Sequence, residues 1–157
     1  MYKRTALYLT LLFLISLVSV TDSFSQDKWW KEKKYKTDFM RTKYELCKKT
    51  FKDIGYGFTY RNVNYITPYF DSQVYLNMVS NDKGYYSSTQ AEQILMNFMD
   101  YFTVSNFKYI RSSRFNTYAF VNGVYSYMVG SARRDLKVAI SLRYYDYKWY
   151  VDQISIN

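Results

Sequence analysis

The chain has 157 residues, a formal net charge of +9, 20 tyrosines and no histidine. Without an imidazole it cannot use Ser-His-Asp or Cys-His nucleophile activation, and most zinc sites are excluded. Cys47 is the only cysteine, so no intramolecular disulfide can form. The sequence has no glycine-rich phosphate loop, paired-cysteine motif or calcium loop. We therefore expect neither a metal site nor a cofactor.

Residues 1–25 have the three-part layout of a secretory signal. Two basic residues precede an uncharged apolar run of 16 residues, Thr5–Val20, and a Ser-Phe-Ser triplet ending at Ser25 supplies a small-x-small cleavage site. We expect cleavage between Ser25 and Gln26 and export to the periplasm or the medium. Cys47 lies too far from the signal to carry the lipid of a bacterial lipoprotein, so we expect a soluble product.

An uncleaved membrane anchor is the alternative for this segment. A spanning helix needs about 20 apolar residues, which is more than the run contains. Positive residues also prefer the cytoplasmic side of a membrane segment. The five lysines after the run outnumber the two basic residues before it, so an anchor with its N-terminus inside would break that rule.

Residues 26–37 alternate lysine with aromatic residues and have no helical or strand period. Such a basic aromatic extension could hold nucleic acid through phosphate contacts and ring stacking, but export argues against that partner. An anionic envelope surface fits better, because tryptophan prefers the membrane interface and lysine is attracted to anionic headgroups. A merely solvated charge run is the simpler alternative. The residues that would make the surface contact are Trp29, Trp30, Lys31, Lys33 and Lys34.

Two helices are predicted in the following domain, residues 38–157. Apolar residues spaced three and four apart start after Asp38 and predict a long amphipathic helix (Met40, Tyr44, Cys47, Phe51, Ile54, Phe58). Two glycines near its end leave open whether it stops at Asp53 or at Tyr60. On this stripe, Cys47 is expected to be a buried thiol. A capping box at Ser87–Gln90 begins the second helix, about Ser88 to Phe102.

Alternating apolar and polar residues predict one strand at residues 74–79, a turn at 81–84, and four later strands at 107–114, 118–129, 135–145 and 148–156. A single helical turn is expected at Thr67-Pro68. In the third of the four later strands one face is polar, which is typical of an antiparallel sheet. The predicted fold class is α+β, a curved antiparallel sheet wrapped on the N-terminal and central helices to enclose a cone.

Three stretches resemble a known family: Tyr69-Phe70-Asp71, Tyr86–Leu95 and Tyr147–Ile156. The sequence is similar to an uncharacterised "domain of unknown function" family of small exported proteins from Gram-negative bacteria, with the nuclear-transport-factor-2-like, or cystatin-like, fold. The resemblance covers roughly Lys49 to Asn157. It implies the cone-shaped fold and supplies no catalytic residues. Its members usually begin soon after their signal, so residues 26–48 look like an addition.

The resemblance also suggests where chemistry would be found. Enzymes that share the broader fold use His-Asp or Tyr-Asp pairs in the cone, and the first kind is excluded here by composition. For the second kind, Asp100 and Asp152 are the candidate general bases, because a carboxylate desolvated in the cone has a raised pKa. A solvated or paired carboxylate is the simpler interpretation of both.

The tyrosines allow two interpretations. Aromatic residues favour strands and pair across them, which is a structural role. They can also form an amphipathic surface that stacks on a small molecule, peptide or glycan, and the candidates are Tyr109, Tyr125, Tyr127, Trp149 and Tyr150.

The preferred hypothesis is an exported, non-enzymatic binding or envelope-associated domain that can form a homodimer through its sheet. The alternative is a small cone-pocket enzyme of isomerase or dehydratase type with an aspartate base and tyrosine donors. The two differ in what they require, because only the enzyme needs Asp100 or Asp152 buried beside a tyrosine hydroxyl.

Overall fold

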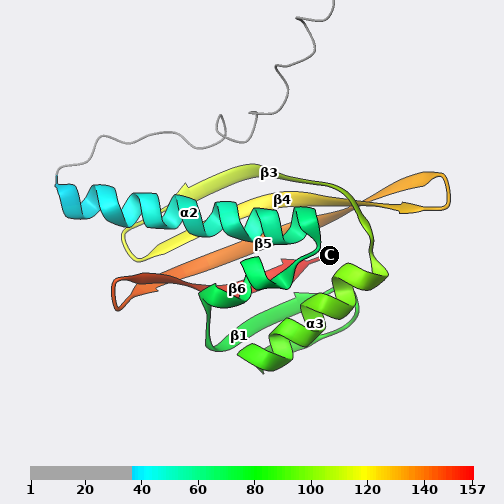
Figure 1. Ribbon diagram of the computed structural model, residues 1–157, viewed down its shortest axis with the longest axis horizontal. Helices are drawn as coiled ribbons and strands as arrows, with labels where there is room; N and C mark the ends of the chain where they lie inside the picture. Colours follow the sequence, from blue (N-terminus) through cyan, green and yellow to red (C-terminus); the bar gives the residue numbers. More distant parts are fainter. Residues whose placement is uncertain (1–36) are drawn as a thin grey trace, which may run out of the picture. The chain divides into compact units, whose positions relative to one another are not determined.

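The computed structural model describes residues 37–157 (Figure 1). The predicted cleavage site at Ser25 and Gln26 and the predicted surface contact lie outside the described residues and stay predictions. That contact comprises Trp29, Trp30, Lys31, Lys33 and Lys34. Within the described part, none of the helices combines the length and the apolar character that crossing a bilayer requires.

The long helix α2 runs Asp38–Tyr60, so it begins at the predicted residue and passes through both glycines. Its N-cap is Thr37, whose side chain accepts a hydrogen bond from the backbone N–H of Met40. It ends at Arg61, which adopts the left-handed conformation (φ 53°) and donates its backbone N–H to the carbonyl of Gly57. The predicted apolar stripe is buried from Tyr44 onward, whereas Met40 is only half-buried.

Two short 3₁₀ turns follow, η2 (Val63–Tyr65) and η3 (Thr67–Tyr69), and the second is the predicted turn at the proline. The helix α3 (Ser88–Tyr101) begins with the predicted capping box. The Ser87 hydroxyl accepts from the backbone N–H of Gln90, and the Gln90 side chain accepts from the backbone N–H of Ser87. The first four N–H groups of a helix have no partner within the helix, and the Ser87 hydroxyl satisfies one of these four, the N–H of Gln90.

The helices pack on a six-stranded sheet, whose strand order is β2-β1-β6-β5-β4-β3. Its strands are β1 (Phe70–Met78), β2 (Lys83–Ser87), β3 (Val104–Arg114), β4 (Tyr118–Val129), β5 (Ala132–Tyr145) and β6 (Lys148–Ile156). Neighbours pair antiparallel except β1 and β6, which are parallel. The α+β class with a curved sheet is confirmed. Two features differ from the prediction: β1 and β6 pair parallel in a sheet that was expected to be antiparallel, and the strand β2 begins within the turn expected at residues 81–84.

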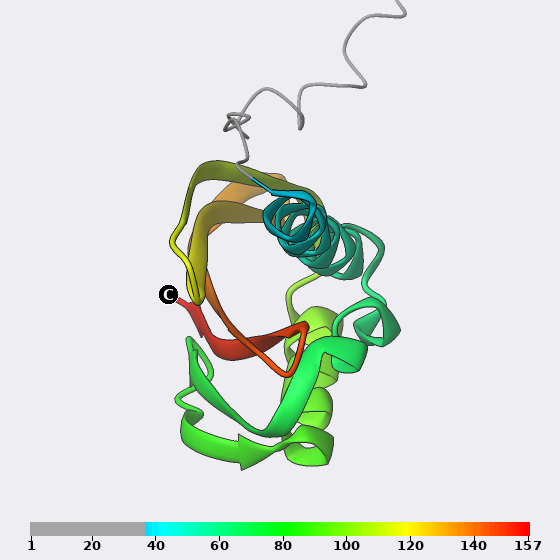
Figure 2. The ribbon, with the colours of Figure 1, turned by 90° about the vertical axis from the view of Figure 1, so that its left-hand side faces the viewer.

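Both helices lie on the concave side of the sheet (Figure 2). Between α2 and the sheet is an aromatic core in which Phe58 stacks on Phe107 with ring centroids 5.0 Å apart and meets Tyr125 edge-on at 6.1 Å. Cys47, fully buried on the same helix, is the expected core thiol, and burial raises its pKa to about 12. No described helix covers the other side of the sheet, which is called the outer face below.

Candidate functional site

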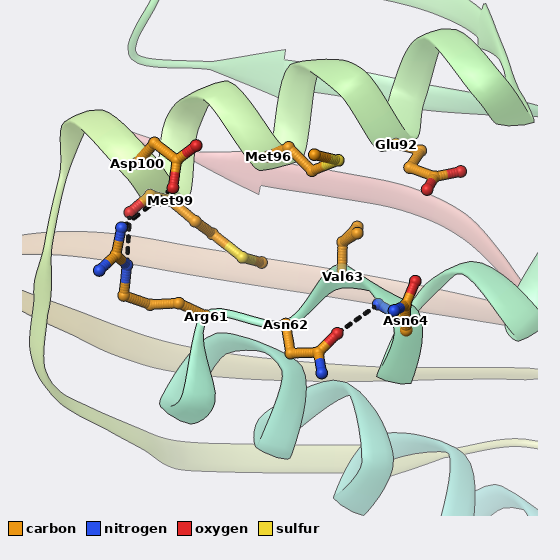
Figure 3. A pocket seen from close by; sticks show the side chains of 8 residues that line it. All are labelled: Arg61, Asn62, Val63, Asn64, Glu92, Met96, Met99 and Asp100. Carbon is orange, nitrogen blue, oxygen red and sulfur yellow. Dashed lines mark hydrogen bonds and ion pairs between the residues drawn. The ribbon is translucent and has the colours of Figure 1, made fainter.

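A hollow of about 300 Å³ opens between α3 and the segment that joins α2 to η2 (Figure 3). We call it the α3 hollow. It is built from two stretches of chain that are about 30 residues apart, and its lining residues are Arg61, Asn62, Val63, Asn64, Glu92, Met96, Met99 and Asp100. A volume of this size is at the lower end of the range of small-molecule sites.

The floor of the α3 hollow is apolar. Val63 and Met99 are buried, while Met96 is more exposed and projects over them from α3. The four lining residues of α3 are spaced four, three and one apart, so they lie on one face of the helix. This face therefore presents two methionines with a carboxylate at either end, Glu92 and Asp100.

Arg61 closes one end of the hollow. Its Nε donates to the carbonyl oxygen of Met99 and its Nη2 to Oδ1 of Asp100, each at 3.0 Å. The left-handed backbone at Arg61 turns the chain after α2, which brings the guanidinium to the last turn of α3. We call these two contacts the Arg61 latch. They join the end of α2 to the last turn of α3, and the guanidinium compensates the charge of Asp100.

The opposite end of the hollow has an uncompensated negative charge. Glu92 is half-buried and makes no ion pair or hydrogen bond with any other described residue. Asn64 lies across from it, and its backbone N–H is held by the side chain of Asn62 at 3.0 Å (Figure 3). The rim as a whole therefore carries a net negative charge on a chain whose formal charge is +9.

The lining residues do not include a hydroxyl, thiol or amine nucleophile. Among the eight there is no serine, threonine, cysteine, lysine or tyrosine. Glu92 and Asp100 are eight residues apart on one helix, a rise of about 12 Å, which is wider than the carboxylate pairs of glycoside hydrolases. No group of three metal-ligating side chains occurs in residues 37–157. The arrangement suits binding of an amphipathic molecule better than bond cleavage.

The two predicted general bases are placed differently from what catalysis would need. The Asp100 side chain is 75% exposed and pairs with Arg61. The Asp152 side chain is one-third exposed and pairs with Arg143 at 2.7 Å. Neither hydrogen bonds to a tyrosine among the described residues, so both fit the simpler interpretation of paired surface carboxylates.

Three of the five predicted aromatic binding residues lie in the core. The hydroxyl of Tyr109 donates to the carbonyl of Phe51 at 2.8 Å, and that of Tyr125 to the carbonyl of Phe102 at 2.5 Å. The indole N–H of Trp149 donates to the carbonyl of Lys43 at 2.9 Å. Burial raises the pKa of Tyr125 to about 12 and that of Tyr109 well above its usual value. These contacts give the three residues structural roles.

Tyr127 and Tyr150, the other two, are half-buried. Tyr127 packs edge-on against Phe102 with ring centroids 4.9 Å apart. Tyr150 stacks on Tyr145 at 4.5 Å, and the hydroxyl of Tyr145 donates to Asp71. That hydrogen bond is the main cause of a lowered pKa at Asp71. Sequence reasoning missed this tyrosine–aspartate pair because its two members are 74 residues apart.

A second missed cluster involves a lysine on α2. The Lys43 side chain is buried, donates to Oδ1 of Asn116 at 3.1 Å and lies 4.0 Å from the ring centroid of Tyr144. Burial, reinforced by the nearby Arg114 guanidinium, lowers the pKa of Lys43. The cation–ring contact compensates part of the desolvation of this ammonium group. This cluster lies apart from the α3 hollow, which shares none of its residues.

The α3 hollow itself was not predicted. The only sequence signal for it is the polar and methionine face of α3, and that face has the same helical period as the core stripe, so the period alone does not mark it as a site. The residues of the loop after α2 gave no signal, because their meeting with α3 is a tertiary contact.

Comparison with known proteins places the chain in a family. The family model described as "Domain of unknown function (DUF4783)" matches residues 51–157. No curated protein matches the sequence. A crystal structure of a DUF4783 family protein from Bacteroides uniformis has a TM-score of 0.60 and 20% identity, covering 68% of this chain and 94% of that one. One from Bacteroides fragilis has a TM-score of 0.59 and 20% identity, covering 66% and 93%.

The fold also has a broader match. An NTF2-like protein from Anabaena variabilis has a TM-score of 0.60 at 10% identity, covering 81% of this chain and 94% of that one. Likeness at such low identity shows the fold alone. The chain therefore belongs to the DUF4783 family of domains of unknown function and has the nuclear-transport-factor-2-like fold.

Proposed function

We propose that this protein is an exported, non-enzymatic binding domain that holds a small amphipathic cation in the α3 hollow. The observation that carries the proposal is the lining of the hollow: an apolar floor of Val63, Met96 and Met99 beside the uncompensated carboxylate of Glu92. An alkyl chain would displace water from the methionines, and an ammonium group would pair with the carboxylate.

The methionine floor supports a ligand of this kind. Methionine is unbranched and polarizable, so it adapts to aliphatic shapes that a branched residue would reject. Met96 is exposed and Met99 beneath it is buried, so Met96 is the methionine whose side chain can change conformation to fit a ligand. At the other end of the hollow the charges of Arg61 and Asp100 compensate each other, so Glu92 is the carboxylate left to pair with the ammonium group.

The proposal is tested with three probes of equal chain length: hexylamine, hexanol and hexanoate. Titrations would be followed by NMR of ¹³C-methyl methionine, with Met128, exposed on β4 and outside the hollow, as the internal control. We expect shifts of the Met96 and Met99 methyls at millimolar concentration, strongest with hexylamine and weakest with hexanoate. Equal response to all three probes, or shifts at Met128 of the same size, would contradict the proposal.

A further inference from the structure

The outer face of the sheet carries two neighbouring rows of side chains that each cross all six strands. Residues paired across strands point to the same face, so the strand register defines the rows. The first, the aromatic row, is Ser113, Phe120, Ser141, Gln153, Tyr75 and Tyr85 in strand order from β3 to β2. The second, the amide row, is Arg111, Asn122, Ala139, Ser155, Asn77 and Lys83 in the same order.

A second hollow, of about 140 Å³, lies where the two rows meet on β4, β5 and β6. We call it the sheet-face hollow. Ala139, the smallest side chain of the amide row, leaves the space, and the ring of Phe120 borders it. The ring of Tyr118 continues the aromatic border, with its centroid 6.3 Å from that of Phe120.

The polar groups of this hollow have unused hydrogen-bonding capacity. Ser141 is only 7% exposed, yet its hydroxyl makes no hydrogen bond with any other described residue. The same holds for the side-chain amides of Asn122 and Gln153 within the described chain. Buried polar groups in proteins are nearly always hydrogen-bonded, so the hydroxyl of Ser141 calls for a partner from outside residues 37–157 or from solvent.

One hydroxyl and two amides beside aromatic rings suit a sugar. The hydroxyl groups of a pyranose can both donate to and accept from amides and serine, while the apolar C–H face of the ring packs on an aromatic side chain. The two rows also lack any carboxylate, so nothing in them would repel an acidic group.

Charge narrows the kind of sugar. The amide row ends in a cation on both sides, Arg111 on β3 and Lys83 on β2, and both are exposed and without an ion pair among the described residues. With strands about 4.8 Å apart, the two ends are roughly 24 Å from each other. We propose that an acidic oligosaccharide lies across the strands, with one ring in the sheet-face hollow and its carboxylates toward Arg111 and Lys83.

The same charges argue against a second copy of the chain on this face. Face-to-face packing about a two-fold axis would bring Arg111 or Lys83 of one copy near a cation of the other in either orientation, which is unfavourable. The proposal is also independent of the proposed function, because the α3 hollow lies on the helix-covered side of the sheet and shares no residue with this one.

The test is calorimetric titration with tetragalacturonate and with maltotetraose, an uncharged tetrasaccharide. We expect tetragalacturonate to bind at least tenfold more tightly at low salt. Phe120→Ala and Asn122→Ala should each weaken it at least fivefold, with unchanged circular dichroism and melting behaviour as the check on folding. The double variant Arg111→Gln/Lys83→Gln should weaken binding and flatten its salt dependence.

The matched control removes two positive charges elsewhere, in Arg134→Gln/Lys52→Gln, and should leave binding within twofold. Several results would overturn the proposal. Equal weakening by the control would mean that only net charge matters, and unchanged binding by Phe120→Ala would mean that the aromatic row is not used. Equal affinity for maltotetraose would reject the acidic class. A dimer in sedimentation that Phe120→Ala dissociates would assign the face to a second copy.

Discussion

Replacing Gly57 in α2 with alanine should destabilise the protein, although alanine is the better helix former. Alanine in a helix interior gains about 1 kcal/mol over glycine. A Cβ at this position, however, would lie 2.5 Å from Cγ1 and 2.8 Å from Cδ1 of Ile66, which is fully buried. Overpacking of a core costs about 1 to 3 kcal/mol, and distances this short place the cost at the upper end. The net loss should be about 2 kcal/mol.

Urea denaturation measures this change through the free energy of unfolding. Gly55→Ala is the matched control, because its Cβ would meet only the edge of the Tyr109 ring at 3.1 Å and the propensity gain can offset that contact. We expect a change within about 0.5 kcal/mol there. A double-mutant cycle with Ile66→Val, which removes Cδ1, should recover part of the loss. Stabilisation by Gly57→Ala in the unmodified chain would refute the close-packing argument.

Three further changes test the caps, the core and the latch. Ser87→Ala removes the hydroxyl that caps α3 and should lower the free energy of unfolding by about 1 kcal/mol in the same urea assay. Tyr125→Phe leaves the Phe102 carbonyl without its donor and should cost about 1 kcal/mol at pH 7. The folded pKa of Tyr125 is about 12, above the unfolded value of about 10, so its contribution to stability is complete below pH 10 and is lost between pH 10 and 12. Over that range the free energy of unfolding of Tyr125→Phe should therefore fall less than that of the unmodified protein. Unfolding measured against pH checks this. Arg61→Gln should loosen the end of α3 and speed amide hydrogen exchange there, without changing exchange in β5.

Local features of the sequence predicted the parts of the fold that depend on nearby residues. The capping box at Ser87 and Gln90 forms as expected because both partners lie within one helical turn. The bounds of β4 and β6 agree with the predicted strands because alternation and turn residues delimit them. The end of α2 stayed open from sequence, since the cost of its glycines is decided by their close approach to Ile66 and Tyr109.

Long-range pairing could not be predicted in the same way. The parallel pairing of β1 with β6 joins segments more than 70 residues apart, and strand alternation contains no information about which neighbour is chosen. No strand was predicted at β2, because its first two residues, Lys83 and Gly84, belong to the turn expected at residues 81–84. The segment forms a strand because it pairs with β1, which the local sequence does not reveal.

The candidate sites show the same division. The tyrosines were given a structural and a binding interpretation, and the chain pattern could not tell that Tyr109 and Tyr125 hydrogen bond to backbone carbonyls in the core. The α3 hollow depends on where the loop at Arg61 meets α3, and the sheet-face hollow depends on Ala139 lying between larger neighbours. Both are consequences of tertiary register rather than of local spacing.

Binding of a small amphipathic cation in the α3 hollow is measured by the affinity of hexylamine for the unmodified protein and for Glu92→Gln. Glu45→Gln, an exposed glutamate on α2 outside the hollow, removes the same charge and serves as the control. A partly exposed ion pair contributes about 0.5 to 1 kcal/mol, so Glu92→Gln should raise the dissociation constant two- to fivefold while Glu45→Gln leaves it unchanged. Equal affinity of all three proteins for hexylamine would contradict the account.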